Sequence, residues 1–386
     1  MFSPAARAAP TRLLLLGFLL TTAWSAAQTP LRIGVVLPYQ DTATSANWNE
    51  YLAARAWERD VADQAAGLPV ELFYRDGGTT PANTLPAIRE LVEQEDVHAV
   101  VCCVTAVSAG SAAAMAARLP ILSLEEPLGG SEDGPLVMVP GRLTVALAMA
   151  QDARRFGRGV GLMTLDNGFG REIVDAVVAA LAETGLPLSR AEQYPPGADV
   201  LTPEALLVAA SEPSAVIVWG LPDDSATAIR GLRARGYEGP VYLPWSLANE
   251  FPGGVRNSLL REALLATPPV VLAEELPPGS PNHEALERLR EVLARAYGVY
   301  GPTLEGALAF DALELLLSAA ELATVYGVSP ADTASFRQAV SDALVAMGPV
   351  DGAAGSYDYD GEDPDLTIPR GVVIATPAPR GLVPAH

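Results

Sequence analysis

The sequence predicts an α/β fold in which a parallel β-sheet is covered by helices on both faces. Three short apolar runs, at residues 31–37, 70–75 and 99–104, alternate with helical patterns that end near residue 66 and span residues 85–95. Apolar runs of this length are typical of strands buried on both faces, because crossover helices cover a parallel sheet on either side. The alternation therefore predicts the α/β class.

The loops that follow these strands predict where a ligand binds. In an open parallel sheet, ligands bind in the crevice outside the carboxyl ends of the strands. Here those ends lead into polar loops at residues 38–46, 76–81 and 105–108. We therefore expect the protein to hold a small molecule rather than to be purely structural.

The same alternation continues in the second half of the chain, after loop material at residues 128–135 and a short extended crossing at 136–139. Proline-rich stretches at 267–269 and 276–281 mark a second boundary, and residues 355–364 are expected to form a turn. The predicted elements are helices 144–156, 171–184, 203–210, 224–236, 283–297, 304–326 and 334–347, and strands 159–164, 188–194, 215–219, 240–243, 262–266 and 370–375.

Residues 1–27 predict an export signal. Arg7 and Arg12 precede an apolar run at residues 13–20, and small residues lead up to Ala27. This order describes a secretory signal peptide cleaved near Ala27, with a buried N-terminal helix as the alternative. We expect a periplasmic or secreted mature chain without membrane insertion after cleavage, because no later run is long and apolar enough to span a bilayer.

The composition describes a globular protein that is long enough for two domains. The chain has 386 residues, of which 49% are hydrophobic and 18% charged, and its formal net charge is −21. Lysine is absent from the sequence, so arginine supplies the basic side chains. A strongly acidic surface repels nucleic acids and anionic lipids, so we expect neither as a partner.

Few residues support catalysis, a metal site or a cofactor. Cys102 and Cys103 are neighbours in one strand, so they face opposite sides and could pair only with strain; we interpret them as small buried hydrophobes. The three histidines lie far apart in the sequence. The sequence contains no Gly-x-Ser-x-Gly nucleophile elbow, no His-Glu-x-x-His zinc motif and no P-loop. We therefore expect no cofactor and no enzyme activity. The acidic run at 358–365 is interpreted as a turn rather than a calcium loop.

Short segments typical of one known family occur in order along nearly the whole mature chain. They are residues 33–38, 70–77, 81–82, 91–92, 97–101, 119–123, 168–170, 232–240, 297–298, 310–313 and 355–361. Together they resemble the type I periplasmic binding proteins, in the branched-chain amino acid (Leu/Ile/Val) family of ABC-transporter substrate-binding proteins.

The resemblance implies two Rossmann-like lobes with parallel sheets, which is the periplasmic-binding-protein type I or Venus-flytrap fold. Lobe one would comprise residues 28–140 and 268–354, and lobe two residues 141–267 and 355–386, with three crossings between them. A small ligand would bind in the cleft, and hinge closure would create the form that an ABC-transporter permease recognises. We expect a monomer.

The resemblance also implies which residues line the cleft in the first lobe. The loop after the first strand offers Tyr39, Asp41 and Thr42, although it lacks the family's usual Thr-Gly-Pro start. The turn after the third strand offers the hydroxyl groups of Thr105 and Ser108. Each of the three residues in the first of these loops could equally be an ordinary solvated residue.

The next strand ends at a departure from the family pattern. Ser123 is followed by Glu125 and Glu126, where the family has a Ser-Pro-Ala-Ala-Thr-like segment. Two carboxylates there would repel a carboxylate and favour a cationic or donor-rich ligand. Alternatively, one or both glutamates point to solvent or bind an arginine such as Arg142. We therefore expect an amino-acid-like, amide or amine ligand.

Three aromatic residues complete the candidate site. Phe169 replaces the tyrosine that the family usually has in a second-lobe loop, so it keeps an apolar wall without the hydroxyl. Trp245 lies where the family often places an acidic group, and Trp219 lies at a strand end. Either indole could stack on a ligand, with a core or rim position as the alternative.

The favoured function is an exported receptor that delivers a solute to an ABC importer. A receptor of the same fold that passes its ligand to a sensor or to a periplasmic oxidation system is the first alternative. The second is a secreted hydrolase that uses Glu125 and Glu126 as a carboxylate pair, although adjacent residues rarely face one another across a substrate.

Overall fold

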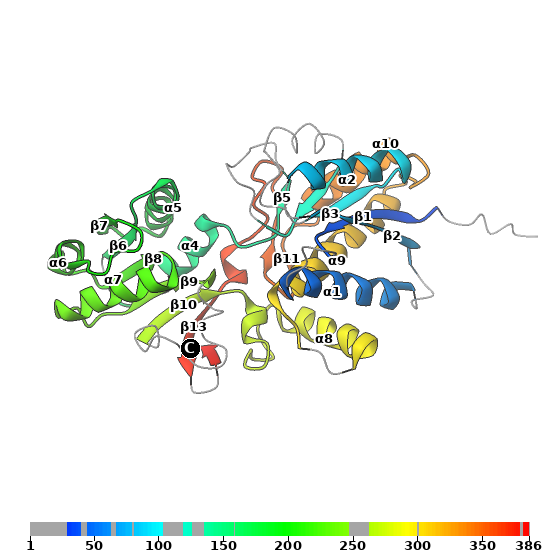
Figure 1. Cartoon of the computed structure of the whole chain (residues 1–386). Coiled ribbons are helices and arrows are strands. Elements are labelled where there is room, and N and C mark those ends of the chain that lie inside the picture. The colour runs from blue at the N-terminus through cyan, green and yellow to red at the C-terminus, as the bar shows by residue number, and fades with distance from the viewer. Residues whose placement is uncertain are drawn as a thin grey trace, which may run out of the picture.

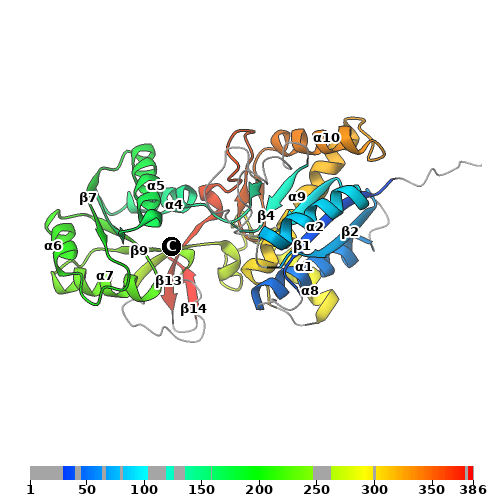
Figure 2. The same ribbon diagram turned by 45° about the horizontal axis from the view of Figure 1, so that its top comes forward.

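The computed structural model of the chain shows two lobes that lie side by side (Figures 1 and 2). It describes residues 29–39, 45–62, 67–78, 81–102, 119–125, 135–157, 159–246, 262–298, 301–378 and 381–385. Each lobe contains a β-sheet with helices packed on both faces, so the predicted α/β class and the two-lobed fold are confirmed.

The first lobe is built on a five-stranded parallel sheet with the order β2-β1-β3-β4-β5. Its strands are β1 (Leu31–Leu37), β2 (Val70–Asp76), β3 (Ala99–Cys102), β4 (Ile121–Ser123) and β5 (Leu136–Val137). One face carries α1 (Ser45–Ala62), α8 (His283–Tyr297), α9 (Leu304–Val325) and α10 (Thr333–Ala346), with the small hairpin of β11 (Val350–Asp351) and β12 (Ser356–Tyr357). The other face carries α2 (Pro81–Gln94).

Alternating side chains of β1 explain why this strand is apolar at nearly every position. Leu31, Ile33, Val35 and Leu37 pack in the core formed with α1 and α9, whereas Val36 packs with α2 on the opposite face. Because helices cover both faces, neither set of side chains meets water, and the strand is a continuous apolar run rather than an alternating one.

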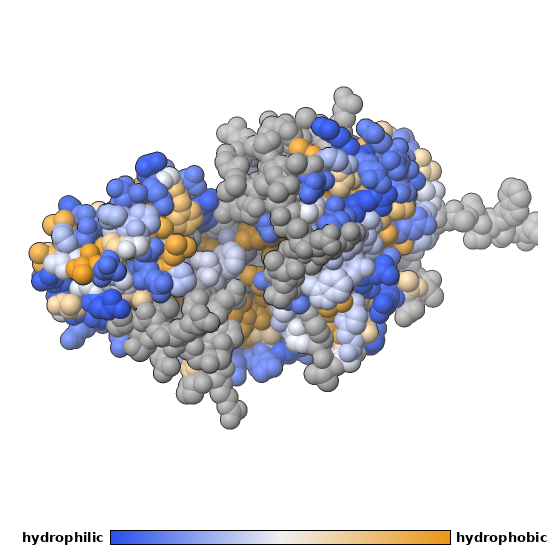
Figure 3. All heavy atoms as spheres, in the orientation of Figure 1, coloured by the Kyte–Doolittle hydropathy of each residue, from blue (hydrophilic) through white to orange (hydrophobic). Residues whose placement is uncertain are grey.

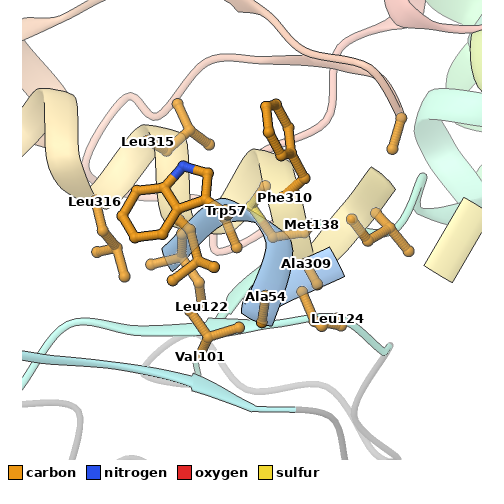
Figure 4. Packing of buried hydrophobic residues seen from close by; sticks show 14 of the residues in the cluster. Ala54, Trp57, Val101, Leu122, Leu124, Met138, Ala309, Phe310, Leu315 and Leu316 are labelled. Carbon is orange, nitrogen blue, oxygen red and sulfur yellow. The ribbon is translucent and has the colours of Figure 1, made fainter. Parts of the chain in front are cut away.

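Trp57 of α1 is among the largest fully buried side chains of the first-lobe core (Figure 4). It packs among apolar residues of β3, β4 and α9, and its indole N–H donates a hydrogen bond of 2.8 Å to Glu314. Because the ring is completely buried and its polar atom is satisfied, truncation to alanine would cost about 3–5 kcal/mol of stability.

The second lobe contains a seven-stranded sheet with the order β14-β13-β10-β9-β8-β6-β7. Its strands are β6 (Val160–Leu165), β7 (Leu188–Tyr194), β8 (Ala215–Trp219), β9 (Val241–Pro244), β10 (Ala263–Thr267), β13 (Val373–Ala378) and β14 (Gly381–Pro384). One face carries α4 (Arg142–Ala153) and α5 (Gly168–Thr184), and the other carries α6 (Thr202–Ala210) and α7 (Pro222–Ala234).

The last two strands differ from the prediction of one strand at residues 370–375. β13 begins later, pairs antiparallel with β10, and is followed by a further antiparallel strand, β14. Pro377 and Pro384 lie within these strands, and proline argues against a strand because it lacks a backbone donor. Near the edge of a sheet, the loss of a backbone N–H donor is tolerated. The prolines therefore did not prevent the β13–β14 hairpin, although the sequence pattern did not predict it.

The helices α5 and α2 begin three and four residues earlier than predicted, both where the sequence favours a helix start. α5 begins at Gly168, because the side chain of Asn167 accepts a hydrogen bond of 2.9 Å from the N–H of Gly170 and so caps the helix. α2 begins at Pro81. Proline is favoured in a first turn, where its missing N–H has no partner to lose.

The chain passes between the lobes three times. It leaves β5 for α4, leaves β10 for the 3-10 helix η3 (Pro269–Leu272) and the helices of the first lobe, and returns through η4 (Pro369–Gly371) to β13. Tyr357 and Leu366 still pack in the first-lobe core, whereas Val372 and Ile374 pack in the second lobe. The lobe boundaries given above stay predictions.

Candidate functional site

The carboxyl edges of both sheets point toward the junction of the lobes. β5 ends at Val137 directly before the passage into α4, and β10 ends at Thr267 directly before the passage back. Strands parallel to these two end at the same edges, which are β1 to β4 in one lobe and β6 to β9 in the other. The space-filling view shows apolar residues in the recess between the lobes, with mainly polar outer surfaces (Figure 3).

Each sheet has one point where the strand order reverses direction. In the first lobe β1 lies between β2 and β3, and in the second lobe β6 lies between β7 and β8. Loops leave such a point toward opposite faces of the sheet, and the crevice between them is where open α/β sheets bind ligands. The candidate site is therefore the space between the carboxyl ends of β1 and β3 and those of β6 and β8.

Tyr39, which follows β1, begins a row of stacked aromatic rings in the first lobe. Its ring stacks on Tyr51 of α1 with centroids 4.8 Å apart, and Tyr51 stacks in turn on Trp48 at 5.3 Å. Tyr74 of β2 meets Tyr51 edge-on at 5.4 Å. Trp48, in the first turn of α1, is 44% exposed, so it is the outer end of this row. Sequence reasoning had named Tyr39 alone.

Ser123 and Glu125 lie at the carboxyl end of β4, beside Cys102 of β3. The Ser123 hydroxyl is buried and donates a hydrogen bond of 2.7 Å to the backbone carbonyl of Glu125. Burial, with the added charge of Glu125, raises the pKa of Cys102 to about 12. Cys102 is therefore a protonated free thiol that is buried, as predicted. The carboxylate of Glu125 lies close enough to contribute to its raised pKa.

Phe169 is 40% exposed in the first turn of α5, directly after β6. The guanidinium of Arg142 lies over its ring at 5.5 Å and forms an ion pair with Glu172 at 3.2 Å. The sequence offers Arg142 as a partner for the glutamates of the first lobe, and the structure pairs it with Glu172 of α5.

Three residues that sequence reasoning missed follow the neighbouring strands β6 and β8. Thr164 pairs with Trp219 across β6 and β8, so Asp166 and Leu221, each two residues further on, lie on neighbouring loops. Asp166, Leu221 and the following Asp223 are all exposed. For Asp166 and Leu221, the signal that could have identified them is their place in the short loop between the end of a strand and the start of the next helix.

The two tryptophans take different positions. Trp219 is only 5% exposed and packs in the core with α4 and α5, while its backbone carbonyl accepts a hydrogen bond from Thr164. Trp245, directly after β9, is half-buried and packs against the cores of both lobes, so it lies at their junction. The remaining predicted site residues lie outside the described residues: Asp41, Thr42, Thr105, Ser108 and Glu126.

A cavity of about 160 Å³ lies elsewhere, between α8, α9 and the β11–β12 hairpin. Its charged lining residues already have partners. Arg288 pairs with Asp60, Asp351 pairs with Arg370 at 2.8 Å, and the buried Asp311 accepts a hydrogen bond of 2.8 Å from Tyr357. The bond between Tyr357 and Asp311 holds the hairpin on α9, so we assign the cavity a structural role.

The described residues contain no group of three or more histidine, cysteine, aspartate or glutamate side chains arranged to hold a metal ion. The acidic run forms the predicted turn: the carboxylate of Asp360 accepts backbone hydrogen bonds from Glu362 at 2.8 Å and Asp363 at 3.0 Å. These bonds lower the pKa of Asp360, because they stabilise its charged form. The candidate site thus combines acidic and aromatic side chains at the carboxyl edges of the two sheets.

A family model described as periplasmic binding protein matches residues 30–372 of this chain. No curated protein sequence matches it. Solved structures with the same fold include an extracellular ligand-binding receptor from Rhodopseudomonas palustris, with 19% identity and a TM-score of 0.66, covering 92% of this chain and 100% of the receptor.

Two further structures carry transport names. One, from Rhodospirillum rubrum, carries the name of a branched-chain amino acid ABC transporter, with 19% identity, a TM-score of 0.71, and coverage of 92% of this chain and 100% of its own. The other is a leucine binding protein, LivK, from Thermotoga maritima, with 17% identity, a TM-score of 0.59 and coverage of 92% and 98%. At these identities the likeness shows the fold.

Proposed function

Because this chain belongs to the periplasmic binding protein family, we propose that it is an exported solute-binding protein that delivers a small ligand to an ABC importer. One observation supports the proposal: the carboxyl edges of the two sheets, each with a reversal point where open α/β sheets usually bind ligands, lie toward the junction of the lobes. A ligand held between them would contact both lobes and draw them together.

The charges around the crevice favour an amino-acid-like, amide or amine ligand. Glu125 from the first lobe and Asp166 and Asp223 from the second are acidic, so they attract an ammonium or amide N–H group. Tyr39 and Phe169 supply aromatic surface for the apolar part of the ligand, one from each lobe. Binding would leave the ligand chemically unchanged.

We further propose that residues 1–27 direct export and are removed, so that the mature protein acts as a monomer in the periplasm. Among the residues that the structure describes, no helix has the length and apolar character needed to cross a membrane. The division into lobes at 28–140 plus 268–354 and 141–267 plus 355–386 belongs to this proposal, with the third crossing moved to residues 367–372, because Tyr357 and Leu366 pack in the first-lobe core. The closed form would dock on the permease.

The proposal is tested by melting the mature chain, residues 28–386, with panels of amino acids, amides, polyamines and short acids or alcohols. A ligand that binds only the folded protein adds RT ln(1 + [L]/Kd), or about 2.7 kcal/mol at one hundred times its Kd. We expect one amine- or amide-bearing class to raise the melting temperature. Unchanged melting with every class would contradict the proposal, and native mass spectrometry of the purified protein would reveal a ligand retained from the cell.

A further inference from the structure

Two of the three passages between the lobes run side by side as they leave the first lobe. The N–H of Val137 donates a hydrogen bond of 2.7 Å to the carbonyl of Pro364, and its carbonyl accepts one of 3.0 Å from Leu366. Val137 thus pairs in parallel with Asp365. The returning chain, which is far away in sequence, extends the first sheet beside β5.

Thr367 connects this extension to the second lobe. Its hydroxyl donates a hydrogen bond of 2.6 Å to the carboxylate of Asp365 and accepts one of 3.3 Å from the N–H of Gly141. Its backbone carbonyl accepts a hydrogen bond of 2.9 Å from the hydroxyl of Thr144. Gly141 and Thr144 belong to the start of α4, whose side chains pack in the second-lobe core. We call Gly141, Thr144, Asp365 and Thr367 the hinge cluster.

The start of α4 depends on the other passage for its hydrogen-bond acceptors. The N-cap residue of α4 is Gly141, which has no side chain to accept from the first N–H groups of the helix. The hydroxyl of Thr367 accepts a hydrogen bond from the N–H of Gly141 itself, and the carboxylate of Asp365 lies at the positive end of the helix dipole. A Cβ atom on residue 141 would lie 2.1 Å from a carboxylate oxygen of Asp365, so only glycine allows this approach.

The two threonines of the hinge cluster are shielded from water, since Thr144 is 4% and Thr367 7% exposed, whereas Asp365 is half-buried. Buried hydrogen bonds are costly to leave unmade, so these residues are expected to keep their partners when the lobes move. The first and third passages would then rotate as one unit. The lobes would keep a narrow range of orientations before a ligand arrives, and such pre-organisation raises affinity because less freedom is lost on binding.

We propose that the hinge cluster is the fixed pivot on which the lobes close, with Asp365 and Thr367 as positioning residues for that motion. The functional meaning of this inference rests on the proposed function, because a pivot matters to a protein that closes on a ligand. The test therefore uses the ligand-free protein and measures the distance between the lobes directly.

The experiment is pulsed electron paramagnetic resonance with nitroxide labels on Glu93→Cys in α2 and Glu183→Cys in α5, two exposed positions in different lobes. The background carries Cys102→Ala and Cys103→Ala. Thr367→Val removes the hydroxyl but keeps the shape, and we expect it to widen the interlobe distance distribution at least two-fold. Thr367→Ser restores the hydroxyl and should return the width to that of the parent protein.

Asp365→Ala should widen the distribution in the same way, whereas Glu362→Ala, which removes the same charge from an exposed position of the same segment, should leave it unchanged. If Asp365→Ala does not fold by circular dichroism, Thr144→Val removes one bond of the cluster and takes its place. The inference would be overturned if Thr367→Val and Asp365→Ala (or its substitute Thr144→Val) both kept the distance distribution of the parent protein. It would also be overturned if the distributions of Thr367→Ser and Thr367→Val were equally wide.

The result is independent of the ligand panel described above. Flat melting curves with all ligands would contradict the proposed transport function and leave the measured widths unaffected. Conversely, unchanged widths with a clear ligand response would remove the hinge cluster as the pivot and keep the receptor function.

Discussion

His98 Nδ1 accepts a hydrogen bond of 2.9 Å from the backbone N–H of Arg32, while Nε2 lies 3.0 Å from the carbonyl oxygen of Pro330. Because Nδ1 accepts, Nε2 carries the proton and donates it to the carbonyl, so the geometry selects the neutral ring. Burial, together with the charge of Arg32, lowers the pKa of His98 to about 4. The ring joins the amino end of the first sheet to the turn between α9 and α10.

This pairing predicts a loss of stability in mild acid. The unfolded chain, in which the histidine has a pKa of about 6.5, binds more protons than the folded protein between pH 6.5 and 4. The His98 contribution to folding is therefore complete above pH 6.5 and declines as the pH falls toward 4. The free energy of unfolding, measured with urea, should be lower at pH 5 than at pH 7.5 in the parent protein. The control variant His283→Gln should show the same decrease. His98→Gln, which cannot titrate, should lack it, and an equal pH dependence in that variant would refute the assignment.

Two buried threonines should respond in opposite ways to replacement by valine. Thr267, at the end of β10, is fully buried, and its hydroxyl has no hydrogen-bond partner among the described residues. Thr164, also fully buried, donates a hydrogen bond of 2.9 Å to Trp219. Thr267→Val removes an unsatisfied group and should be neutral or stabilising by about 1 kcal/mol, whereas Thr164→Val should cost about 1–2 kcal/mol. Equal losses in denaturant unfolding would show that Thr267 has an unseen partner.

The buried carboxylate of Asp60 should contribute more to stability than an exposed one. It lies in α1 and forms ion pairs with Arg288 and Arg295 of α8. Asp60→Asn leaves both guanidinium groups without their counter-charge and should cost about 2 kcal/mol, because both arginines keep some contact with water. Glu287→Gln, which removes a half-exposed partner of Arg290, should cost less than about 0.5 kcal/mol. Similar losses from the two variants in urea unfolding would contradict this ranking.

Phe169 should matter for ligand binding and little for folding. Its ring is exposed on the crevice side of α5, so Phe169→Ala should weaken the binding of the compound that stabilises the protein most by about ten-fold, which corresponds to about 1.4 kcal/mol. Val178→Ala, at a similarly exposed position of the same helix, is the matched control and should leave both binding and melting unchanged. Isothermal titration measures the affinities. Equal affinities for the two variants would remove Phe169 from the site.

Much of the architecture could be predicted because it depends on local patterns. β1, β7, β8 and α8 begin and end at the predicted residues, since apolar run length and helical periodicity are properties of neighbouring residues. The hydrogen bonds between segments that are distant in the sequence could not be predicted in this way. Arg32 and His98 are 66 residues apart, and Gly141 and Thr367 are 226 apart, so no local pattern connects them.

The candidate site could be predicted only in part, for the same reason. Phe169 was placed by its position in a recognisable segment. Asp166 and Leu221 were missed, because their nearness follows from β6 and β8 being neighbours, and strand order is a property of the folded chain. Trp219, chosen for its residue type and its place at a strand end, lies in the core instead of on the surface of the crevice.

The order in which the chain builds its two cores has a consequence for biosynthesis. The first core needs α8 to α10, and the second sheet needs β13 and β14, which end at Pro384. Neither lobe can therefore finish packing before these late segments have been synthesised. The two lobes therefore complete their folding together, after most of the chain has been synthesised.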